Sequence, residues 1–116
     1  MALRPEILRY KKDFDRLYKR GRSVGEKYVV VFHISNGLGY SRKAFLASKK
    51  VGGAVARNRA RRLMKEGFRK FESEVSAGRD ILFIARKEAV SAGAAAVEAS
   101  IRRALNKSGL IKQGNR

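Results

Sequence analysis

Apolar residues recur at helical spacing in three segments of the chain. They predict one helix over residues 10–19 that Gly21 ends, a second helix over about residues 54–71, and a third over residues 92–106 that ends near Gly109. The apolar positions of the second segment lie one, three or four residues apart, so they form a single stripe along a helix. These positions are Ala56, Ala60, Leu63, Met64, Gly67, Phe68 and Phe71.

Three other segments have the composition of β-strands. Residues 26–34 are rich in Val, Tyr and Phe, and a turn at Asn36-Gly37 separates them from residues 41–48, so these two segments predict a β-hairpin. Residues 81–85 read ILFIA, an apolar run typical of a buried strand. The predicted order is helix, strand, strand, helix, strand, helix, with room for one more strand before the second helix. This order indicates a single-domain α+β sandwich of helices packed on one sheet.

The charge of the chain restricts its partners. The 116 residues fit one domain with one modest core, and 28 Lys and Arg against 10 Asp and Glu give a formal net charge of +18. A compact domain with this much self-repulsion is typical of proteins with a polyanionic partner. Nucleic acid is the first candidate, and an anionic membrane surface is the second. We expect one domain over residues 1–116, with the order of a tail at 108–116 left open.

Several classes of protein are excluded by what the sequence lacks. It has no Cys and a single His, His33, so disulfides and Cys/His zinc sites are ruled out. No apolar run reaches about 18 residues, which excludes a membrane-spanning helix. Residues 1–12 lack the apolar core of a signal peptide. We therefore expect a cytoplasmic protein.

The second predicted helix carries the most information about function. Residues 49–65 contain seven cations and no acid, although like charges four residues apart repel each other on a helix. Arginine can bind a phosphate with two hydrogen bonds, and an amide can read a base edge or bind a sugar. A solvated helix face is the common alternative, but mixed charges would serve solubility better. The side opposite the apolar stripe is therefore a candidate surface for RNA or DNA, and it holds Asn58, Arg61, Arg62, Lys65 and Arg69.

Two sets of residues are spaced so that each set shares one face. Phe14 and Tyr18 lie one helical turn apart, and Tyr28, Val30 and Phe32 alternate along the first long strand. On an open surface, aromatic rings stack unpaired bases at about 1–3 kcal/mol per base. The alternative is that these rings belong to the core, which the spacing favours for Phe14 and leaves open for Tyr18 and Phe32.

Catalytic motifs are scarce. The chain has no phosphate-binding loop of the GxxxxGK type and no serine with a recognisable His and Asp partner. His33 falls within a strand and is expected to be structural, and the acids Glu72, Glu74 and Asp80 are scattered near a loop. We expect neither a catalytic residue nor a metal ligand in this chain.

Residues 48–69 resemble a known signature. They read SKKVGGAVARNRARRLMKEGFR and are similar to the SKK-(I/V)-G-N-A-V-x-R-N-R segment of the bacterial ribonuclease P protein subunit, with Gly53 where that family usually has Asn. Two further elements agree in order and spacing, an Asp-Phe…Gly element at residues 13–21 and an ILFIARK strand at residues 81–87. The likeness extends over about residues 8–105.

This resemblance implies a role in transfer-RNA maturation. The family's holoenzyme removes the 5′ leader of precursor tRNA by hydrolysing one phosphodiester bond, and its RNA subunit performs the chemistry with Mg²⁺ that the RNA mainly binds. The protein subunit, itself monomeric, binds the RNA subunit, grips the leader and promotes metal-ion binding. The family fold is similar to the second domain of ribosomal protein S5. It is a mixed sheet with a left-handed β-α-β crossover, whose helix would be residues 54–71.

The resemblance also implies two sets of site residues, carried over by position. The first set would contact the RNA subunit and the region of cleavage, and comprises Lys49, Lys50, Arg57, Asn58, Arg59, Arg61, Arg62, Lys65 and Arg69. The second set would line a cleft for the leader, and comprises Phe14, Tyr18, Tyr28, Val30, Phe32, Leu46, Arg61, Lys65 and Lys87.

Two other functions fit part of the pattern. A ribosomal-protein-like module with a basic α+β domain would bind ribosomal RNA and have no enzymatic role. A metal-dependent nuclease would cleave RNA without an RNA subunit, but it would need a cluster of carboxylates that the sequence does not suggest.

Overall fold

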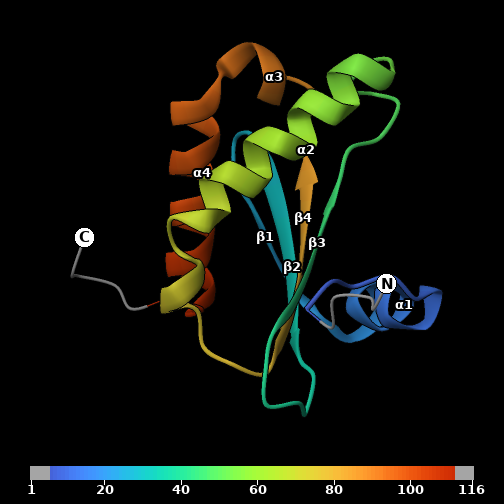
Figure 1. Ribbon diagram of the computed structural model, residues 1–116, viewed down its shortest axis with the longest axis vertical. Helices are drawn as coiled ribbons and strands as arrows, with labels where there is room; N and C mark the ends of the chain where they lie inside the picture. The colour runs from blue at the N-terminus through green and yellow to red at the C-terminus, as the bar shows by residue number, and fades with distance from the viewer. Residues whose placement is uncertain (1–5, 112–116) are drawn as a thin grey trace, which may run out of the picture.

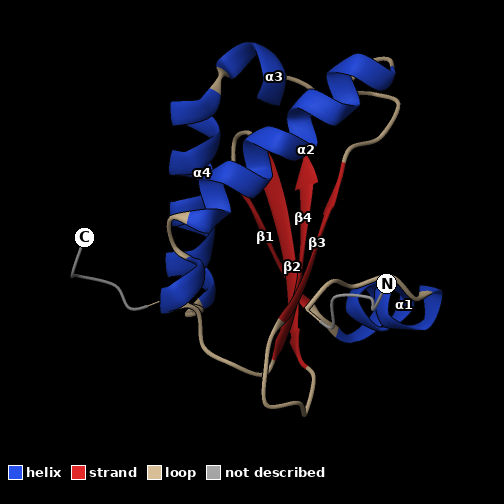
Figure 2. Ribbon diagram, viewed as in Figure 1, coloured by secondary structure: helices blue, strands red, loops and turns tan. Residues whose placement is uncertain are grey.

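The computed structural model describes residues 6–111. In chain order its elements are α1 (Lys11–Arg20), β1 (Arg22–Gly25), β2 (Val29–Ser35), β3 (Arg42–Leu46), α2 (Ala54–Arg69), the 3₁₀ turn η1 (Glu72–Glu74), β4 (Arg79–Ala85), α3 (Ala89–Ala92) and α4 (Ala94–Ser108). The strands form one sheet, with α2 and α4 on one side of it and α1 on the other (Figure 1, Figure 2). The predicted α+β class is therefore confirmed.

β4 occupies the interior of the sheet, whose strand order is β1-β2-β4-β3. It pairs antiparallel with β2 and parallel with β3, so α2 connects two parallel neighbours in a β-α-β crossover. The predicted hairpin between residues 26–34 and 41–48 is wrong, because β4 lies between β2 and β3. The apolar run at residues 81–85 explains the difference, since it buries side chains on both faces and is best placed between two other strands.

The sequence pattern misses one strand. β1 pairs antiparallel with β2 along its whole length. Its sequence, RSVG, is too short and too polar to indicate a strand, and of its side chains only Val24 packs against the main core. The strand predicted over residues 26–34 begins at Val29, because residues 26–28 connect β1 to β2.

The main core lies between the sheet and the helices α2 and α4. Phe83 of β4 is fully buried there, with its ring stacked on Phe45 at 4.9 Å and tilted against Phe68 of α2 at 4.7 Å between ring centroids. Full burial of one such side chain contributes about 1.5–3 kcal/mol. α2 ends at Arg69, two residues before its predicted end at Phe71, whose ring is still buried in the core. This layer fixes α2 over the sheet and turns its polar side outward.

The last predicted helix, over residues 92–106, corresponds to α4, which begins two residues later. Gly93, with a φ of 90° that glycine adopts readily, separates α4 from the short α3 that precedes it. α4 continues to Ser108, and Leu110 and Ile111 beyond it are buried, while residues 112–116 of the predicted tail lie outside the described residues. None of the helices described is both long and apolar enough to span a membrane.

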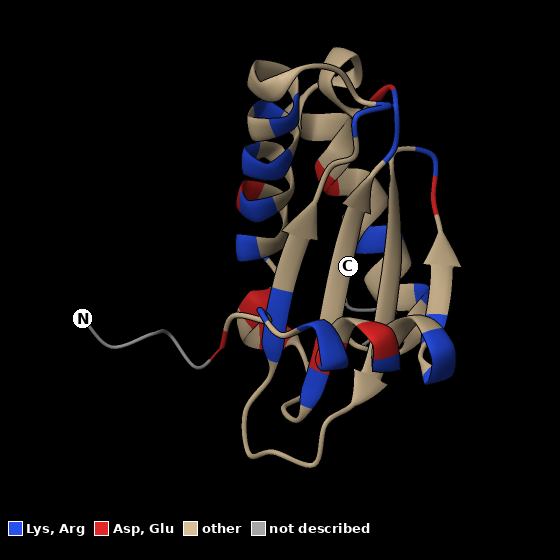
Figure 3. Cartoon of the chain, turned by 90° about the vertical axis from the view of Figure 1, so that its right-hand side faces the viewer, with Lys and Arg blue, Asp and Glu red and all other residues tan. Residues whose placement is uncertain are grey.

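The opposite face of the sheet is only partly covered. A second, smaller cluster holds α1 against this face through Leu17, which is buried together with Leu8, Ala44 and Leu82. α1 crosses the sheet near the end at which β4 begins, and Figure 3 shows no other described helix over the strands beyond it. We call this uncovered part the open sheet face. Its partly exposed side chains are Val30, Phe32, Leu46 and Ile84.

A buried ion cluster holds α1 at that end of the sheet. The carboxylate of Asp80 is fully buried and accepts two hydrogen bonds from Arg42, at 2.9 and 2.7 Å. It accepts a third from Arg16 of α1 and a fourth from Asn36, each at 2.9 Å. Arg42 also reaches Asp13 of α1 at 3.4 Å. Because this cluster joins α1 to β3, β4 and the loop after β2, α1 stays at one end and leaves the rest of the face open.

Candidate nucleic-acid interface

The exposed side of α2 forms a surface that we call the outer ridge, made of Asn58, Arg59 and Arg62. These three residues line a shallow hollow together with Val55 and Glu66. They share one side of the helix because positions three and four apart are neighbours on its surface. Val55 is 84% exposed, so apolar surface lies beside the cations. Figure 3 shows basic residues repeated along α2, and the outer ridge offers guanidinium groups to phosphates and an amide to bases or sugars.

A second basic surface of α2 faces the edge of the sheet. Arg61 and Lys65 line a groove of about 230 Å³ together with Phe14 of α1 and Leu46 of β3. We call it the α2–β3 groove. α2 supplies two of its cations, and α1 and β3 supply much of its apolar surface. Cations beside apolar surface are the combination that holds single-stranded nucleic acid. Four residues of the predicted leader cleft are therefore brought together.

Tyr18 and Phe32 meet at the margin of the open sheet face. Their rings lie edge to face, with centroids 5.2 Å apart and planes at 78°. Tyr18 is 48% exposed, while Phe32 and Phe14 are half-buried around the second cluster. On the same face, Val30 of β2 lies opposite Ile84 of β4. This face thus adds partly exposed aromatic and aliphatic surface to that of the groove.

One residue of the predicted cleft lies elsewhere. Tyr28 packs against the main core on the helical side of the sheet, with Lys27 Nζ 5.6 Å from its ring centroid. The expected alternation with Val30 fails because β2 begins only at Val29, so Tyr28 is not held by the pleat of the strand. Lys87 is exposed in the loop that follows β4.

The remaining basic residues of the predicted RNA surface lie in three environments. Lys49 and Lys50 are exposed in the turn after β3, where the backbone N–H of Lys50 donates to Ser48 Oγ at 3.2 Å. Arg69 is exposed at the end of α2. Arg57 is half-buried, whereas the residues of the outer ridge are exposed. Its Nε is buried and has no hydrogen-bond partner among the described residues. In addition, Arg61 donates a hydrogen bond to Asn58 Oδ1, which links the outer ridge to the groove.

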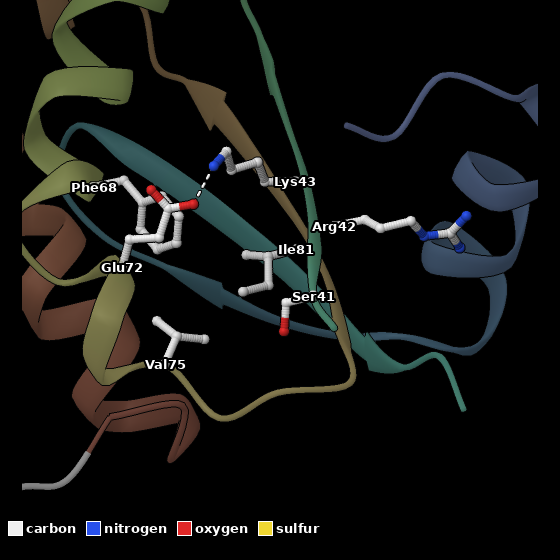
Figure 4. A pocket seen from close by; sticks show the side chains of 7 residues that line it. All are labelled: Ser41, Arg42, Lys43, Phe68, Glu72, Val75 and Ile81. Atoms are coloured by element: carbon white, nitrogen blue, oxygen red, sulfur yellow. Dashed lines mark hydrogen bonds and ion pairs between the residues drawn. The ribbon is translucent and has the colours of Figure 1, made fainter. Parts of the chain in front are cut away.

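One ion pair beside the groove is not predicted by the sequence. Lys43 of β3 lines the groove and an adjoining small pocket, where it pairs with Glu72 of η1 (Figure 4). Phe68, Val75 and Ile81 supply the apolar wall of this pocket. Because Glu72 neutralises Lys43, positive charge in the groove is concentrated at Arg61 and Lys65. The sequence gives no indication of the pair, since its members are 29 positions apart.

The two most enclosed carboxylates are held by cations. Burial alone raises the pKa of Asp80, but hydrogen bonds, chiefly from Arg42, lower it below its usual value. Burial likewise raises the pKa of Glu26, and Arg103 and Lys107 lower it by hydrogen bonds of 2.8 and 2.5 Å. Both groups are therefore ionised at neutral pH and serve the fold. Within residues 6–111, no three His, Asp or Glu side chains gather as a metal site.

Fold and surface together define a small, basic α+β protein built to bind a nucleic acid. The family model for ribonuclease P matches residues 3–109 of the chain. The chain therefore belongs to the ribonuclease P protein family, as the signature at residues 48–69 predicts, and it is a protein component of an RNA-binding ribonuclease complex.

Relatives and solved structures agree with this assignment. The chain is 38% identical over 110 residues to the ribonuclease P protein component of Thermoanaerobacter sp. (strain X514), with 93% of this chain and 95% of that protein covered. It is 40% identical over 100 residues to the component from Clostridioides difficile (strain 630), with 85% and 88% covered. The RNase P protein of Staphylococcus aureus gives a TM-score of 0.84 at 29% identity, covering 94% of this chain and 100% of that chain. The protein from Thermotoga maritima gives 0.77 at 31%, covering 88% and 96%.

Proposed function

We propose that this chain is the protein subunit of a ribonuclease P holoenzyme and assists a catalytic RNA subunit in removing the 5′ leader from precursor tRNA. The observation that carries the proposal is the α2–β3 groove beside the open sheet face. There, Arg61 and Lys65 line one groove together with the apolar side chains of Phe14 and Leu46. Single-stranded nucleic acid binds where cations follow its backbone and apolar rings receive its bases, and the leader is such a strand.

The two basic surfaces of α2 have different tasks in this proposal. The outer ridge contacts the RNA subunit and the region of cleavage, and the groove holds the leader. Since both surfaces belong to one helix that is packed on the core, the distance between the two RNA strands is fixed by the protein. Such positioning lowers the entropic cost of bringing the scissile bond to the catalytic RNA.

Mg²⁺ bound mainly by the RNA subunit would supply an activated water and stabilise the leaving oxygen at the scissile bond. The chain itself reduces the repulsion between converging RNA strands through its net charge of +18. By fixing the leader relative to the RNA subunit, it would also fix phosphate oxygens near the scissile bond, and in this way it would promote the binding of Mg²⁺. Its enclosed acids, Asp80 and Glu26, are occupied by arginine and lysine side chains.

A module that binds ribosomal RNA is the alternative with the same charge. It would use the outer ridge but would need neither the groove nor the open sheet face. The ribonuclease P family match over residues 3–109 favours the leader-processing function.

Replacing Phe32 with alanine is expected to weaken the binding of precursor tRNA and to leave the binding of mature tRNA, which has no leader, unchanged. The Phe32 ring lies against Tyr18 at the margin of the open sheet face. Losing one stacked base costs about 1–3 kcal/mol, or roughly 5- to 150-fold in Kd. Dissociation constants of both tRNAs, measured on the holoenzyme reconstituted with the RNA subunit, check this expectation.

Tyr40→Ala is the matched control for this experiment. Tyr40 is an exposed aromatic residue in the loop between β2 and β3 and does not line the groove. Its removal should change neither dissociation constant. If Phe32→Ala weakens the binding of precursor and mature tRNA equally, the open sheet face does not hold the leader.

A further inference from the structure

A second basic hollow lies at the end of the sheet away from the start of α2. It has a volume of about 250 Å³ and is lined by Arg20, Arg22, Arg79 and His33. Arg20 ends α1, Arg22 begins β1 and Arg79 begins β4, so three elements bring their arginines to one place. Figure 1 shows the starts of β1 and β4 and the end of β2 together at this end, whereas α2 begins beyond the opposite end.

Gly21 explains how two of these arginines reach the hollow. Its backbone N–H donates to the Leu17 carbonyl oxygen at 2.9 Å and ends α1. A Cβ at this position would lie 2.4 Å from that oxygen and 3.0 Å from the carbonyl oxygen of His33, so only glycine fits without movement of the backbone. The chain therefore passes from α1 to β1 through a single residue, and Arg20 and Arg22 both reach the hollow.

The charges of the hollow are not compensated by acids. Among the described residues, no acid lines it, and Arg20, Arg22 and Arg79 take part in none of the ion pairs. The nearby Arg16 and Arg42, by contrast, are both paired with Asp80 on the other face. Like charges gathered in this way repel each other, so their arrangement indicates an anionic partner.

His33 gives an independent indication of a ligand. The residue is 5% exposed and lines the hollow, and its Nδ1 is buried with no hydrogen-bond partner in the described part of the chain. Burial lowers the pKa of His33, and the charges of Arg79 and Arg22 lower it further, so the imidazole is neutral at pH 7. A buried polar atom without a partner is destabilising. His33 therefore lies beside the three arginines with one ring nitrogen unpaired, and its ring senses any charge bound in the hollow.

We propose that Arg20, Arg22 and Arg79 form a second phosphate-binding site, which takes a phosphodiester group of RNA. The planar fork of arginine suits phosphate oxygens, and three arginines from different elements can surround one group. The site and the start of α2 lie near opposite ends of the sheet (Figure 1). These ends are separated by roughly 23 Å, which is the length of the seven-residue β2 at about 3.3 Å per residue. The site therefore contacts a different phosphate from those at the first turns of α2. The RNA that supplies this phosphate is the catalytic subunit or the tRNA. This part of the proposal rests on the proposed function.

The single histidine of the chain makes the site directly testable without RNA, by NMR of the His33 ring during a titration with inorganic phosphate. In the unaltered protein, phosphate should raise the pKa of His33 in a saturable manner, because a bound anion offsets the charges of Arg22 and Arg79. In the Arg22→Ala/Arg79→Ala variant, that pKa should start higher and phosphate should add nothing.

The matched control is Lys12→Ala/Arg102→Ala, which removes the same two charges from α1 and α4, away from the hollow. It should keep the phosphate response of the unaltered protein. Neither variant should melt at a lower temperature than the unaltered protein, since none of the removed side chains forms an ion pair with another described residue. A missing response in the unaltered protein, or a response retained without Arg22 and Arg79, overturns the proposal.

Two RNA assays then identify the source of the phosphate. One measures binding of the chain to the RNA subunit, and the other measures binding of precursor tRNA to the holoenzyme. Loss of two contacts should lower the slope of log K against log salt by about 1.4–1.8, relative to the control variant, in the assay that contains the contacted RNA. Slopes equal to the control's in both assays overturn the proposal. If no variant activates an RNA subunit at all, the proposed function fails, and the phosphate titration still decides whether the site exists.

Discussion

Replacing Asp80 with alanine is expected to lower the free energy of unfolding by about 3–5 kcal/mol, the range found when one partner of a buried ion pair is removed. Asp80 is fully buried and accepts hydrogen bonds from Arg16, Arg42 and Asn36. Without it, two arginine side chains that are 34% and 17% exposed repel each other under α1. Since both keep some contact with water, the loss should fall near the lower end of the range. Urea unfolding measures it.

Asp15→Ala is the matched control for Asp80. Asp15 also carries an ion pair, with Lys11 at 2.8 Å, but that pair lies on the surface of α1. Its removal should leave the free energy of unfolding nearly unchanged. An equally small effect at Asp80 would contradict the conclusion that the ion cluster holds α1 against the sheet.

The pH dependence of stability follows from the same cluster. The pKa of Asp80 is lowered in the folded protein, so the folded state binds its proton less readily than the unfolded chain does. The resulting stabilisation is fully present above the unfolded pKa of about 3.9 and is lost as the pH falls through the lower folded value. Glu26 contributes in the same direction. Unfolding measured at a series of pH values should show a loss of stability below about pH 4, and Asp80→Ala should reduce that loss.

The Arg59→Ala/Arg62→Ala variant is expected to bind the RNA subunit on the order of tens of times more weakly at about 0.1 M salt. Both residues line the hollow of the outer ridge and have no part in the core. Each phosphate contact contributes about 0.7–0.9 to the slope of log K against log salt, so losing two should lower the slope by about 1.4–1.8. Binding measured at several salt concentrations gives both quantities. Arg57 is left intact because it is half-buried and its removal would also alter packing.

Lys70→Ala tests whether any cation near α2 has this effect. Lys70 directly follows the helix and is paired with Glu98 at 2.7 Å, so its charge is already compensated by the protein. It should change the slope little. If the slope of Arg59→Ala/Arg62→Ala is also unchanged, the outer ridge does not contact phosphates.

Local sequence was sufficient to predict the helices and strands whose formation depends on one segment of the chain. The apolar stripe and the signature predicted α2 within two residues of its end, and the run ILFIA predicted β4 as a buried strand. The hairpin failed because the turn at Asn36-Gly37 is only a local preference. β4, which arrives some 40 residues later, pairs with both strands and separates them. Strand order is decided by such distant pairings, which no single segment contains.

In the candidate site, too, residues placed by one segment were predictable, and residues placed by distant contacts were not. Residues on α2 were predictable because one helix places them, and the structure brings Arg61 and Lys65 to Phe14 and Leu46. Their contacts with RNA stay predictions. The position of α1 was not predictable, because it depends on Asp80, which is 64 positions from Arg16.

The proposed function requires that the chain activates a catalytic RNA and does not cleave RNA itself. The most direct test is the rate of 5′ leader release from labelled precursor tRNA with Mg²⁺ at low salt, measured with the protein alone, the bacterial RNA subunit alone, and both together. We expect no cleavage by the protein alone and a large acceleration of the RNA subunit when the protein is added. Cleavage by the protein alone, or an RNA subunit whose rate the protein leaves unchanged, would contradict this account.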